Sequence, residues 1–255
     1  MITSKLVGGL GNYLFQIATA YSLSIDNNDT ISFNMNDATQ IHKNLNEYSN
    51  NILKKIEFTN IKSNQNDNYN EPSFTYNEIP YKPNMVLNGY FQSEKYFSHN
   101  RDKILELFDI SEHKDYLNKK YGNLLNNNTC SIHVRHGDYL NLSDSHPPCS
   151  IEYYKNAIKC MGDNTLFLVF SDDINWCKSV FKDDKFYFIE NELDYIDLYL
   201  MSMCKNNIIA NSTFSWWGSW LNKNKEKKII APSKWFGKKI NHDTKDLIPK
   251  EWIVM

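Results

Sequence analysis

Arginine is scarce in this chain, which makes its few arginines conspicuous. Of the 28 lysine and arginine residues, only Arg101 and Arg135 are arginines. Arg135 lies in the stretch CSIHVRHGDY (residues 130–139), where an apolar run passes into a polar, glycine-containing segment. A guanidinium offers a planar, bidentate grip on phosphate or carboxylate that lysine lacks. Arg135 is therefore a candidate anion-binding residue. The alternative is that it pairs with Asp138 and only holds the loop, and the local sequence does not separate the two.

Polar side chains also follow two later apolar runs. Asp172 comes directly after the run 165–170 and Ser171, and the segment 212–215 follows the run 208–210. Because the carboxyl ends of parallel strands meet at one edge of a sheet, we expect these residues to lie near Arg135. A carboxylate there can accept from N–H groups or hydroxyls, and a helix that begins at Ser212 can hold phosphate with its amides. Together they describe a pocket for a nucleoside diphosphate.

Each of these residues also has a purely structural interpretation. Asp172 could cap the next helix, and so could Ser212 or Thr213. His133 alternates with apolar neighbours and could be a hydrogen-bonded core histidine. The tryptophans at 216, 217 and 220 are predicted to be core residues rather than ligand contacts. The coincidence of three polar strand ends favours a binding site.

The second half of the chain alternates regularly between strand and helix patterns. Strands are predicted at 129–134, 165–170, 186–189, 208–210 and 228–231. Helices are predicted at 151–161, 192–203 and in the stretches that end near 181 and 221, with Ser150 and Asn191 as N-caps. Strands separated by helices of this length imply a parallel sheet covered on both faces, that is, a doubly wound α/β fold.

The first half gives a weaker version of the same pattern. A strand at 2–7 leads into a glycine-rich turn at 8–13 and a helix at 14–24; a strand at 85–87 and helices at 101–108 and 111–121 follow. Residues 34–81 are polar and difficult to assign. The asparagines at 126–128 mark the predicted boundary between an N-terminal half (1–125) and a C-terminal half (126–255).

Composition narrows the partners. With 255 residues and a net charge of −2, the chain is large enough for a substantial core and carries no basic excess for nucleic acid. Its five cysteines are scattered, which fits a reducing compartment, and no apolar stretch is long enough to span a membrane. We therefore expect a cytoplasmic protein without a transmembrane anchor. Its oligomeric state is not predicted.

Several ligand-binding motifs are missing or incomplete. The glycines at 9 and 11 begin a dinucleotide-binding pattern, but Leu14 stands where the third glycine belongs. There is no P-loop and no Gly-x-Ser-x-Gly. There is also no Asp-x-Asp, the motif with which many sugar-nucleotide enzymes hold a divalent cation. If the ligand is a sugar nucleotide, protein groups such as Arg135 must neutralise the diphosphate.

As a set, these residues resemble the α-1,2-fucosyltransferase family (glycosyltransferase family 11). The matching segments are GGLGN (8–12) with Phe15-Gln16, GYFQSEKYF (89–97), HVRHGDY (133–139), FSDD (170–173) with Trp176, and NSTFSWW (211–217). They occur in the family's order and extend from residue 8 to residue 220. The segment 34–81 has no recognisable counterpart.

The resemblance implies a fold and an activity. It implies a GT-B-like α/β fold with two Rossmann-like halves, each with a doubly wound parallel sheet, that face a cleft. The implied activity is inverting transfer of L-fucose from GDP-β-L-fucose to the 2-OH of a galactose, without a divalent metal or other cofactor. GDP-fucose and a galactose-containing glycan would be the partners.

The resemblance also implies roles for individual residues. Arg135 would hold the diphosphate, and Gly11 and Asn12 would face the fucose, with Arg135 and Asn12 as the catalytic pair. The other donor-binding residues would be His133, Asp172 (on guanine), Ser212, Thr213, Phe214 and Ser215. Acceptor-side candidates are Tyr90, Gln92, Glu94 and Asp138. The general base stays open among Glu94, Asp138 and Asp144.

The chain departs from the family pattern at two positions. His136 stands where a second arginine is usual, and Tyr13 where glutamine is usual. His136 could weaken donor affinity or, because imidazole titrates near neutrality, make it depend on pH. The alternatives are a different GDP-deoxyhexose or acceptor, a sugar-nucleotide-binding module without turnover, and, on the incomplete glycine motif, an NAD-dependent oxidoreductase.

Overall fold

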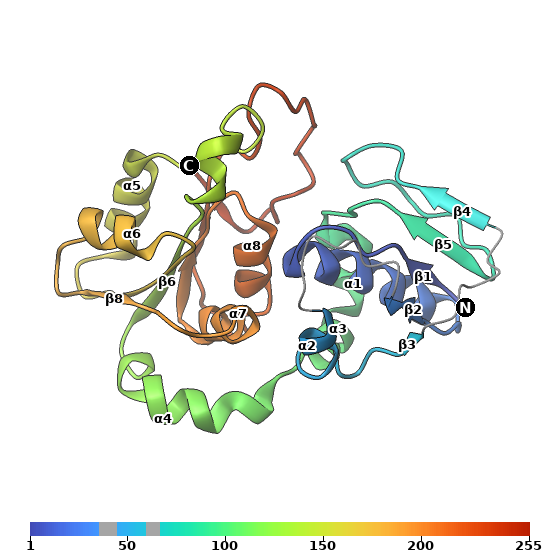
Figure 1. The fold of residues 1–255 in the computed structure, drawn as a ribbon, viewed down its shortest axis with the longest axis horizontal. Coiled ribbons are helices and arrows are strands. Elements are labelled where there is room, and N and C mark those ends of the chain that lie inside the picture. The colour runs from blue at the N-terminus through green and yellow to red at the C-terminus, as the bar shows by residue number, and fades with distance from the viewer. Residues whose placement is uncertain (36–44, 60–66) are drawn as a thin grey trace. The chain divides into compact units, whose positions relative to one another are not determined.

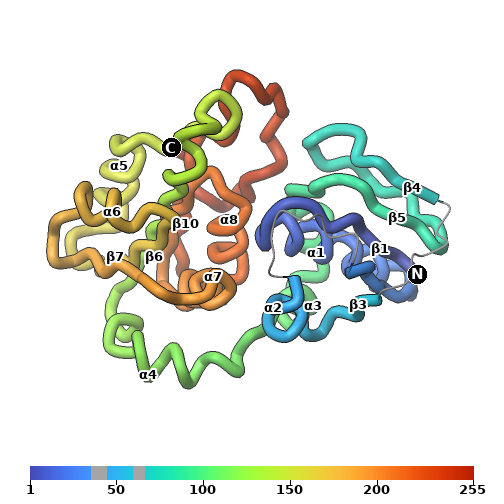
Figure 2. Tube along the Cα trace, in the orientation of Figure 1, coloured from blue at the N-terminus to red at the C-terminus, as the bar shows by residue number. Residues whose placement is uncertain are grey.

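The computed structural model describes residues 1–35, 45–59 and 67–255, which form two compact units (Figures 1 and 2). The first unit comprises residues 1–110 and 242–249, and the second comprises 111–241 and 250–255. The predicted boundary after residue 125 falls inside the second unit, between a helix and the first strand of its sheet. The assignment of acceptor and donor to the two halves stays a prediction.

The second unit is built on a six-stranded parallel sheet with the order β11-β10-β9-β6-β7-β8. Its strands are β6 (Thr129–Val134), β7 (Leu166–Ser171), β8 (Phe186–Phe188), β9 (Asn206–Ile208), β10 (Ile229–Ala231) and β11 (Ile253–Val254). The helices are α4 (Lys114–Leu125), α5 (Ile151–Met161), α6 (Ile174–Val180), α7 (Asp194–Met203) and α8 (Thr213–Trp220), with 3₁₀ turns η4 (Ser111–His113) and η5 (Asp138–Leu142). The predicted parallel α/β architecture of this half is confirmed.

Helices cover both faces of this sheet, with α5 and α6 on one side and α7 and α8 on the other (Figure 1). All six residues of β6 are buried. Cys130, Ile132 and Val134 belong to a core cluster that includes residues of α5 and α6. The alternate residue His133 points to the opposite face, where its ring lies 5.5 Å from that of Phe214 on α8. A strand buried on both faces explains the nearly continuous apolar run in the sequence.

The first unit holds smaller parallel sheets around a long helix. The strands β1 (Thr3–Ser4), β5 (Met85–Asn88) and β4 (Asp67–Asn70) pair in the order β1-β5-β4, and β2 (Phe33–Asn34) pairs with β3 (Phe58–Thr59). The helices are α1 (Leu10–Asp26), α2 (Leu45–Ser49) and α3 (Arg101–Leu107), with 3₁₀ turns η2 (Glu94–Tyr96) and η3 (Ser98–Asn100). Most of α1 is buried, including its central residues Leu14, Ile17 and Ala18.

Several boundaries differ from those predicted. Helix α1 begins at Leu10, so Gly11 lies in its first turn and not in a loop. Strands β4 and β11 were not predicted. Ser150 caps α5 as predicted, because its hydroxyl accepts from the Tyr153 amide, whereas the N-cap of α7 is Leu193 and not Asn191. Among the described residues, no helix is both long and apolar enough to cross a membrane.

Candidate active site

The sheet of the second unit brings the three predicted polar strand ends to one edge. In the sheet, β6 lies between β7 and β9, with His133 beside Phe170 and Ile132 beside Ile208. Arg135, Asp172 and the segment 211–215 therefore leave the carboxyl ends of three adjacent parallel strands. The expected juxtaposition of the strand ends is confirmed, while the roles of the residues stay predictions.

The guanidinium of Arg135 is held between two carboxylates. One terminal nitrogen lies 2.6 Å from Asp138 Oδ2, and Nε lies 3.5 Å from Asp172 Oδ2. The guanidinium carbon lies 5.6 Å from the centre of the Tyr139 ring. The pairing with Asp138, which the sequence offered as the structural alternative, is present. It does not exclude anion binding, because Asp138 is half exposed and an exposed ion pair is weak enough to exchange.

Asp172 does not cap the following helix. That role belongs to its neighbour Asp173, whose carboxylate accepts from the Trp176 amide at 3.1 Å. Asp172 instead accepts from the backbone amide of His136 at 2.9 Å, which orders the loop after Arg135. Although burial works in the opposite direction, this amide bond and the nearby Arg135 lower the pKa of Asp172. Asp172 is therefore an ionised carboxylate at the strand edge, not a helix cap.

His133 is buried, and one of its ring nitrogens has no partner in the part of the chain that the structure describes. Its side chain is only 4% exposed, and Nδ1 has no hydrogen-bond partner in the described part of the chain. Burial, reinforced by the charge of Arg135, lowers the pKa of His133 to about 3. The imidazole is thus neutral at physiological pH and is not the satisfied core histidine of the structural interpretation.

The hydroxyl groups at the start of α8 differ in how accessible they are to a ligand at the sheet edge. Ser212 is the N-cap residue, but its side chain makes no capping hydrogen bond. Ser212, Thr213 and Phe214 are half-buried, whereas Ser215 is fully buried with its hydroxyl against the carbonyls of Ala210 and Ser212. The structure therefore does not bring the Ser215 side chain to the site surface. The amides of the first turn of α8 carry the helix's positive partial charge.

His136, the departure from the family pattern, is tied to the beginning of α6. Its ring stacks on Trp176 with 4.3 Å between centroids, and Nδ1 lies 2.9 Å from Asp173 Oδ2. The imidazole thereby braces the cap of α6. A donor-linked pH effect of His136 stays a prediction.

In the first unit, the turn before α1 positions Asn12. Gly8 has a φ of +92°, and a Cβ on it would lie 2.1 Å from Asn12 Nδ2. Asn12 Oδ1 accepts from Gln92 Nε2 at 3.1 Å, while Gln92 Oε1 is buried without a partner among the described residues. Gly11 lies beside Asn12 in the first turn of α1. Asn12 and Gln92, predicted separately, are therefore in direct contact.

Glu71 is a residue of this region that the sequence did not indicate. Its carboxylate accepts from the backbone amide of Tyr90 at 2.7 Å and from that of Phe91 at 3.1 Å. Phe91 has a φ of +52°, and a Cβ on Gly89 would lie 2.4 Å from Glu71 Cβ. Glu71 thus holds the turn that leads to Gln92. It lies in the polar segment that matched no motif, so no local signal marks it.

The remaining acceptor-side candidates are divided between the units. Tyr90 is 42% exposed at the tip of the turn held by Glu71, and Glu94 begins η2. Asp138 belongs to the second unit, where it binds Arg135. In the part of the chain that the structure describes, no group of three or more His, Cys, Asp and Glu side chains is arranged to hold a metal ion.

A covered parallel sheet with a cation, a carboxylate and a helix start at its carboxyl edge is typical of α/β enzymes that bind phosphorylated ligands. The sequence profile of glycosyl transferase family 11 matches residues 1–255, so the chain belongs to this family. It is a glycosyltransferase, as the motif set predicted.

Curated relatives cover nearly the whole chain. The O-antigen biosynthesis glycosyltransferase WbnK of Escherichia coli is 35% identical over 91% of this chain and 94% of its own. An α-1,2-colitosyltransferase of Escherichia coli is 30% identical over 99% of this chain and 98% of its own. A putative galactoside 2-α-L-fucosyltransferase of Caenorhabditis elegans is 25% identical over 84% and 66%, respectively.

Solved fucosyltransferases share the fold. The α-1,6-fucosyltransferase NodZ, in a crystal grown with GDP, superimposes with a TM-score of 0.55 and 14% identity over 85% of this chain and 91% of that chain. The apo form of POFUT1 superimposes with a TM-score of 0.50 and 11% identity, over 90% and 96%. The predicted GT-B-like α/β class is thereby confirmed.

Proposed function

We propose that the protein is an inverting glycosyltransferase that moves L-fucose from GDP-β-L-fucose to the 2-OH of a galactose in a glycan. The observation that carries the proposal is the carboxyl edge of the second unit's sheet, where Arg135, Asp172 and the start of α8 converge in a member of family 11. The names of two relatives, which specify 1,2-linked transfer of a deoxyhexose, support the linkage.

The donor is held by the edge residues of the second unit. In this proposal the guanidinium of Arg135 exchanges its bond to Asp138 for the diphosphate. The amides of Thr213 and Phe214 complete the anion site, whereas that of Ser212 donates to the Ala210 carbonyl. Asp172 and the neutral His133 lie against the nucleoside and the sugar. NodZ, which shares the fold, crystallises with GDP, and this supports a guanine nucleotide.

The reaction is a single displacement at the anomeric carbon. The galactose 2-oxygen forms a bond to that carbon as the bond to the β-phosphate oxygen breaks, and the electron pair departs with GDP. The hydroxyl proton passes to a carboxylate base, for which Glu94, Asp138 and Asp144 stay candidates. Arg135 and the α8 amides stabilise the charge that develops on GDP, which is the kind of preorganised stabilisation that lowers barriers most. Asn12 and Gln92 orient the sugars.

A second donor has specific support. The 30% identical relative is named for colitose, another deoxyhexose, and it matches this chain almost from end to end. GDP-colitose in place of GDP-fucose would use the same diphosphate and guanine contacts, because the difference lies in the sugar.

No divalent metal is part of the proposed mechanism. The sequence contains no Asp-x-Asp, and the groups proposed to meet the diphosphate charge are the Arg135 guanidinium and the partial positive charges of the backbone amides at the start of α8. Chelation with EDTA should therefore leave the initial rate unchanged within about twofold. If a metal ion stabilised the leaving group, its removal would lower turnover far more, because one preorganised donor alone contributes about 10²–10³. A loss of activity that added Mg²⁺ or Mn²⁺ restores would contradict this part of the proposal.

A donor and acceptor panel tests the whole proposal. GDP-fucose, GDP-colitose, GDP-mannose and UDP-galactose are each incubated with the protein, with and without a galactoside, and nucleotide release is followed. Release of GDP from GDP-fucose that requires the galactoside, with an α-1,2-fucoside as product, is expected. Faster transfer from GDP-colitose would support the second donor. Donor binding without turnover in every combination would indicate a non-catalytic sugar-nucleotide-binding module and overturn the proposal.

A further inference from the structure

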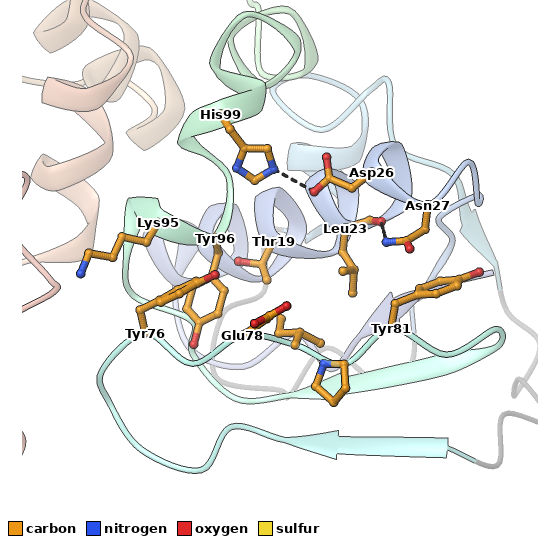
Figure 3. Close-up of a pocket in the computed structure, with 12 residues that line it drawn as sticks. Thr19, Leu23, Asp26, Asn27, Tyr76, Glu78, Tyr81, Lys95, Tyr96 and His99 are labelled. Atoms are coloured by element: carbon orange, nitrogen blue, oxygen red, sulfur yellow. Dashed lines mark hydrogen bonds and ion pairs between the residues drawn. The ribbon is translucent and has the colours of Figure 1, made fainter.

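A cavity in the first unit contains none of the residues assigned above. It has a volume of about 360 Å³ and lies between the second half of α1, residues 76–81 and the turns η2 and η3 (Figure 3). This volume lies within the range of about 300–1,000 Å³ that is usual for small-molecule sites. The space is large enough for one or two sugar units.

Aromatic rings form one part of its wall. The rings of Tyr76 and Tyr96 lie 4.9 Å apart at 55° to each other, and Tyr81 lines the cavity further along. Tyr96 is buried, whereas Tyr76 is 37% exposed. The Tyr96 hydroxyl accepts from the Asn77 amide, which leaves its own proton available to donate. Ring faces with nearby polar tips suit a ligand with both apolar and hydroxyl surfaces.

Two polar groups on the wall have no hydrogen-bond or ion-pair partner among residues 1–35, 45–59 and 67–255. Thr19 Oγ1 is buried, in a residue that is 1% exposed, and has no hydrogen-bond partner among the described residues. A buried hydroxyl without a partner is uncommon in folded proteins and indicates a site for a polar ligand atom. Glu78 differs in that it is exposed, and its carboxylate, which makes no ion pair or hydrogen bond within the described part of the chain, is solvated and free to accept from a ligand. In Figure 3 both side chains lie at the centre of the cavity wall.

The other charged groups of the cavity are already paired. Asp26 Oδ2 lies 2.8 Å from His99 Nε2, and Asp26 Oδ1 accepts from Asn100 Nδ2 at 2.8 Å. Lys95 forms an ion pair with Asp246. The groups that are left are one uncompensated carboxylate, one hydroxyl and three tyrosines. They do not favour an anion. They match a pyranose, which has vicinal hydroxyls and an apolar ring face.

We propose that this cavity binds a sugar unit of the acceptor glycan, distant from the unit that is glycosylated. Thr19 and Glu78 would hold its hydroxyls, and Tyr76 and Tyr96 its apolar face. The inference rests on the proposed function in one respect, namely that Asn12 marks the reacting end of the first unit. Thr19 follows Asn12 by seven residues on the same face of α1, about 10 Å along the helix at 1.5 Å per residue. A ligand at Asn12 and a ligand at Thr19 are thus different sugars of one chain.

The test compares a short acceptor with a long one. Methyl β-galactoside and a tetrasaccharide that ends in β-galactose are assayed with the wild type, Thr19→Val and Glu78→Gln. The wild type is expected to have a KM at least about tenfold lower for the tetrasaccharide, and each variant should lose about tenfold of that preference, the value of one good hydrogen bond. The kcat/KM for methyl β-galactoside should change less than about twofold, because that acceptor does not reach the cavity. Glu106→Gln, an exposed carboxylate on α3, is the matched control and should leave both acceptors unaffected.

Thr19→Val should fold, because it replaces an unpartnered buried hydroxyl by a methyl group of the same shape. Equal effects on the two acceptors, or a wild type without preference for the longer one, would overturn the proposal. Binding without donor separates this result from the proposed transfer reaction. Saturation-transfer NMR of the tetrasaccharide should show contacts with the wild type that Thr19→Val weakens, even if no sugar is transferred. Contacts that persist unchanged in both variants, or that are missing in the wild type, would also overturn it.

Discussion

At the scale of single residues, Arg135 is distinguished by geometry as well as by scarcity. Its guanidinium meets Asp138 with one nitrogen and Asp172 with another, an arrangement that an ammonium on a flexible stem cannot reproduce. The two carboxylates orient the group before the donor arrives. Arg135→Lys should therefore lower turnover by roughly 10²–10³ at saturating donor, measured as the initial rate of GDP release.

The other arginine provides the control for this substitution. Arg101 begins α3 in the first unit, so Arg101→Lys makes the same chemical change outside the proposed donor site. Its turnover should stay within about threefold of the wild type, well below the effect of losing a preorganised donor. If Arg135→Lys retained comparable activity, Arg135 would be only a loop brace through Asp138.

The sequence identified which residues gather at the sheet edge but not how each one is oriented. Asp172 and Asp173 are neighbours in the sequence just after β7, and both could cap the next helix. Because β7 ends at Ser171 and α6 begins at Ile174, Asp173 is the residue in the cap position. Ser215 has a hydroxyl that could contact phosphate, yet its place as the third residue of α8 directs that hydroxyl to backbone carbonyls. The direction of such a side chain depends on the residue at which the helix begins. Residue type alone does not determine that position.

At the scale of elements, the turn between β5 and η2 depends on a single carboxylate. Glu71 accepts both amides of residues 90 and 91, and Gln16 Nε2 donates to the Gly89 carbonyl on the other side. Glu71→Gln keeps one acceptor oxygen but removes the charge and replaces the other oxygen by an NH₂ group, which weakens the bonds to these amides and loosens the turn that carries Tyr90 and Gln92. Because hydrogen bonds to a charged group contribute about 1.5–3 kcal/mol, we expect the acceptor KM to rise about tenfold or more while donor affinity is unchanged.

The test of Glu71→Gln compares its effects on the acceptor KM, measured from initial rates, and on the donor Kd, measured by calorimetry. Only the acceptor KM should change. Asp67→Asn is the control and should alter neither, because Asp67 begins β4, the strand that ends just before Glu71, and forms an exposed ion pair with Lys82. An equal loss in both constants would contradict this prediction, because it would mean that the substitution destabilises the whole protein and does not act on the turn alone.

Elements with strong local signals were predicted to the residue, and those that depend on pairing were not. β6 and α5 have the predicted bounds because six buried residues in succession and a serine cap determine them locally. β4 has the sequence Asp-Asn-Tyr-Asn, which carries no strand pattern and forms a strand through its pairing with β5. α1 begins four residues earlier than predicted, because Gly8 adopts a positive φ and completes the turn before Leu10.

At the scale of the whole molecule, the chain returns to its first unit near the C-terminus. Residues 242–249 belong to that unit, where Asp246 accepts from the Tyr76 amide and His242 stacks on Phe74 at 4.8 Å. Nothing in the local sequence of this segment predicts the return, since its partners lie about 170 residues earlier. This segment supports residues 73–77, at the edge of the cavity proposed to bind glycan.

Two buried ionisable groups of the second unit should give the molecule opposing dependences of stability on pH. Burial and Arg135 lower the pKa of His133 from 6.5 to about 3, with Asp172 as the opposing charge. Burial, with Glu192 and Asp194 and against Lys120, raises the pKa of Asp197 from 3.8 to about 7. At a pH between its two pKa values, His133 is protonated in the unfolded chain and neutral in the folded chain. Asp197 is the reverse: between its two pKa values it is protonated in the folded chain and ionised in the unfolded chain. His133 therefore makes the free energy of unfolding rise with pH, and Asp197 makes it fall, each by up to about 1.4 kcal/mol per pH unit.

The two slopes should largely cancel between about pH 4 and 6.5, so single substitutions should reveal them. Relative to the wild type, His133→Asn should gain stability as pH falls through this range, because the unfolded state no longer takes up that proton. Asp197→Asn should gain stability as pH rises from about 4 to 7, because the folded state no longer has to keep protonated a carboxylate whose Oδ1 has no partner among the described residues. Urea unfolding of both variants and the wild type, at half-unit steps across about pH 4.5–7.5, measures the two differences, in which all other titrating groups cancel. Two variants with parallel, pH-independent differences would show that neither buried group changes its proton occupancy on folding.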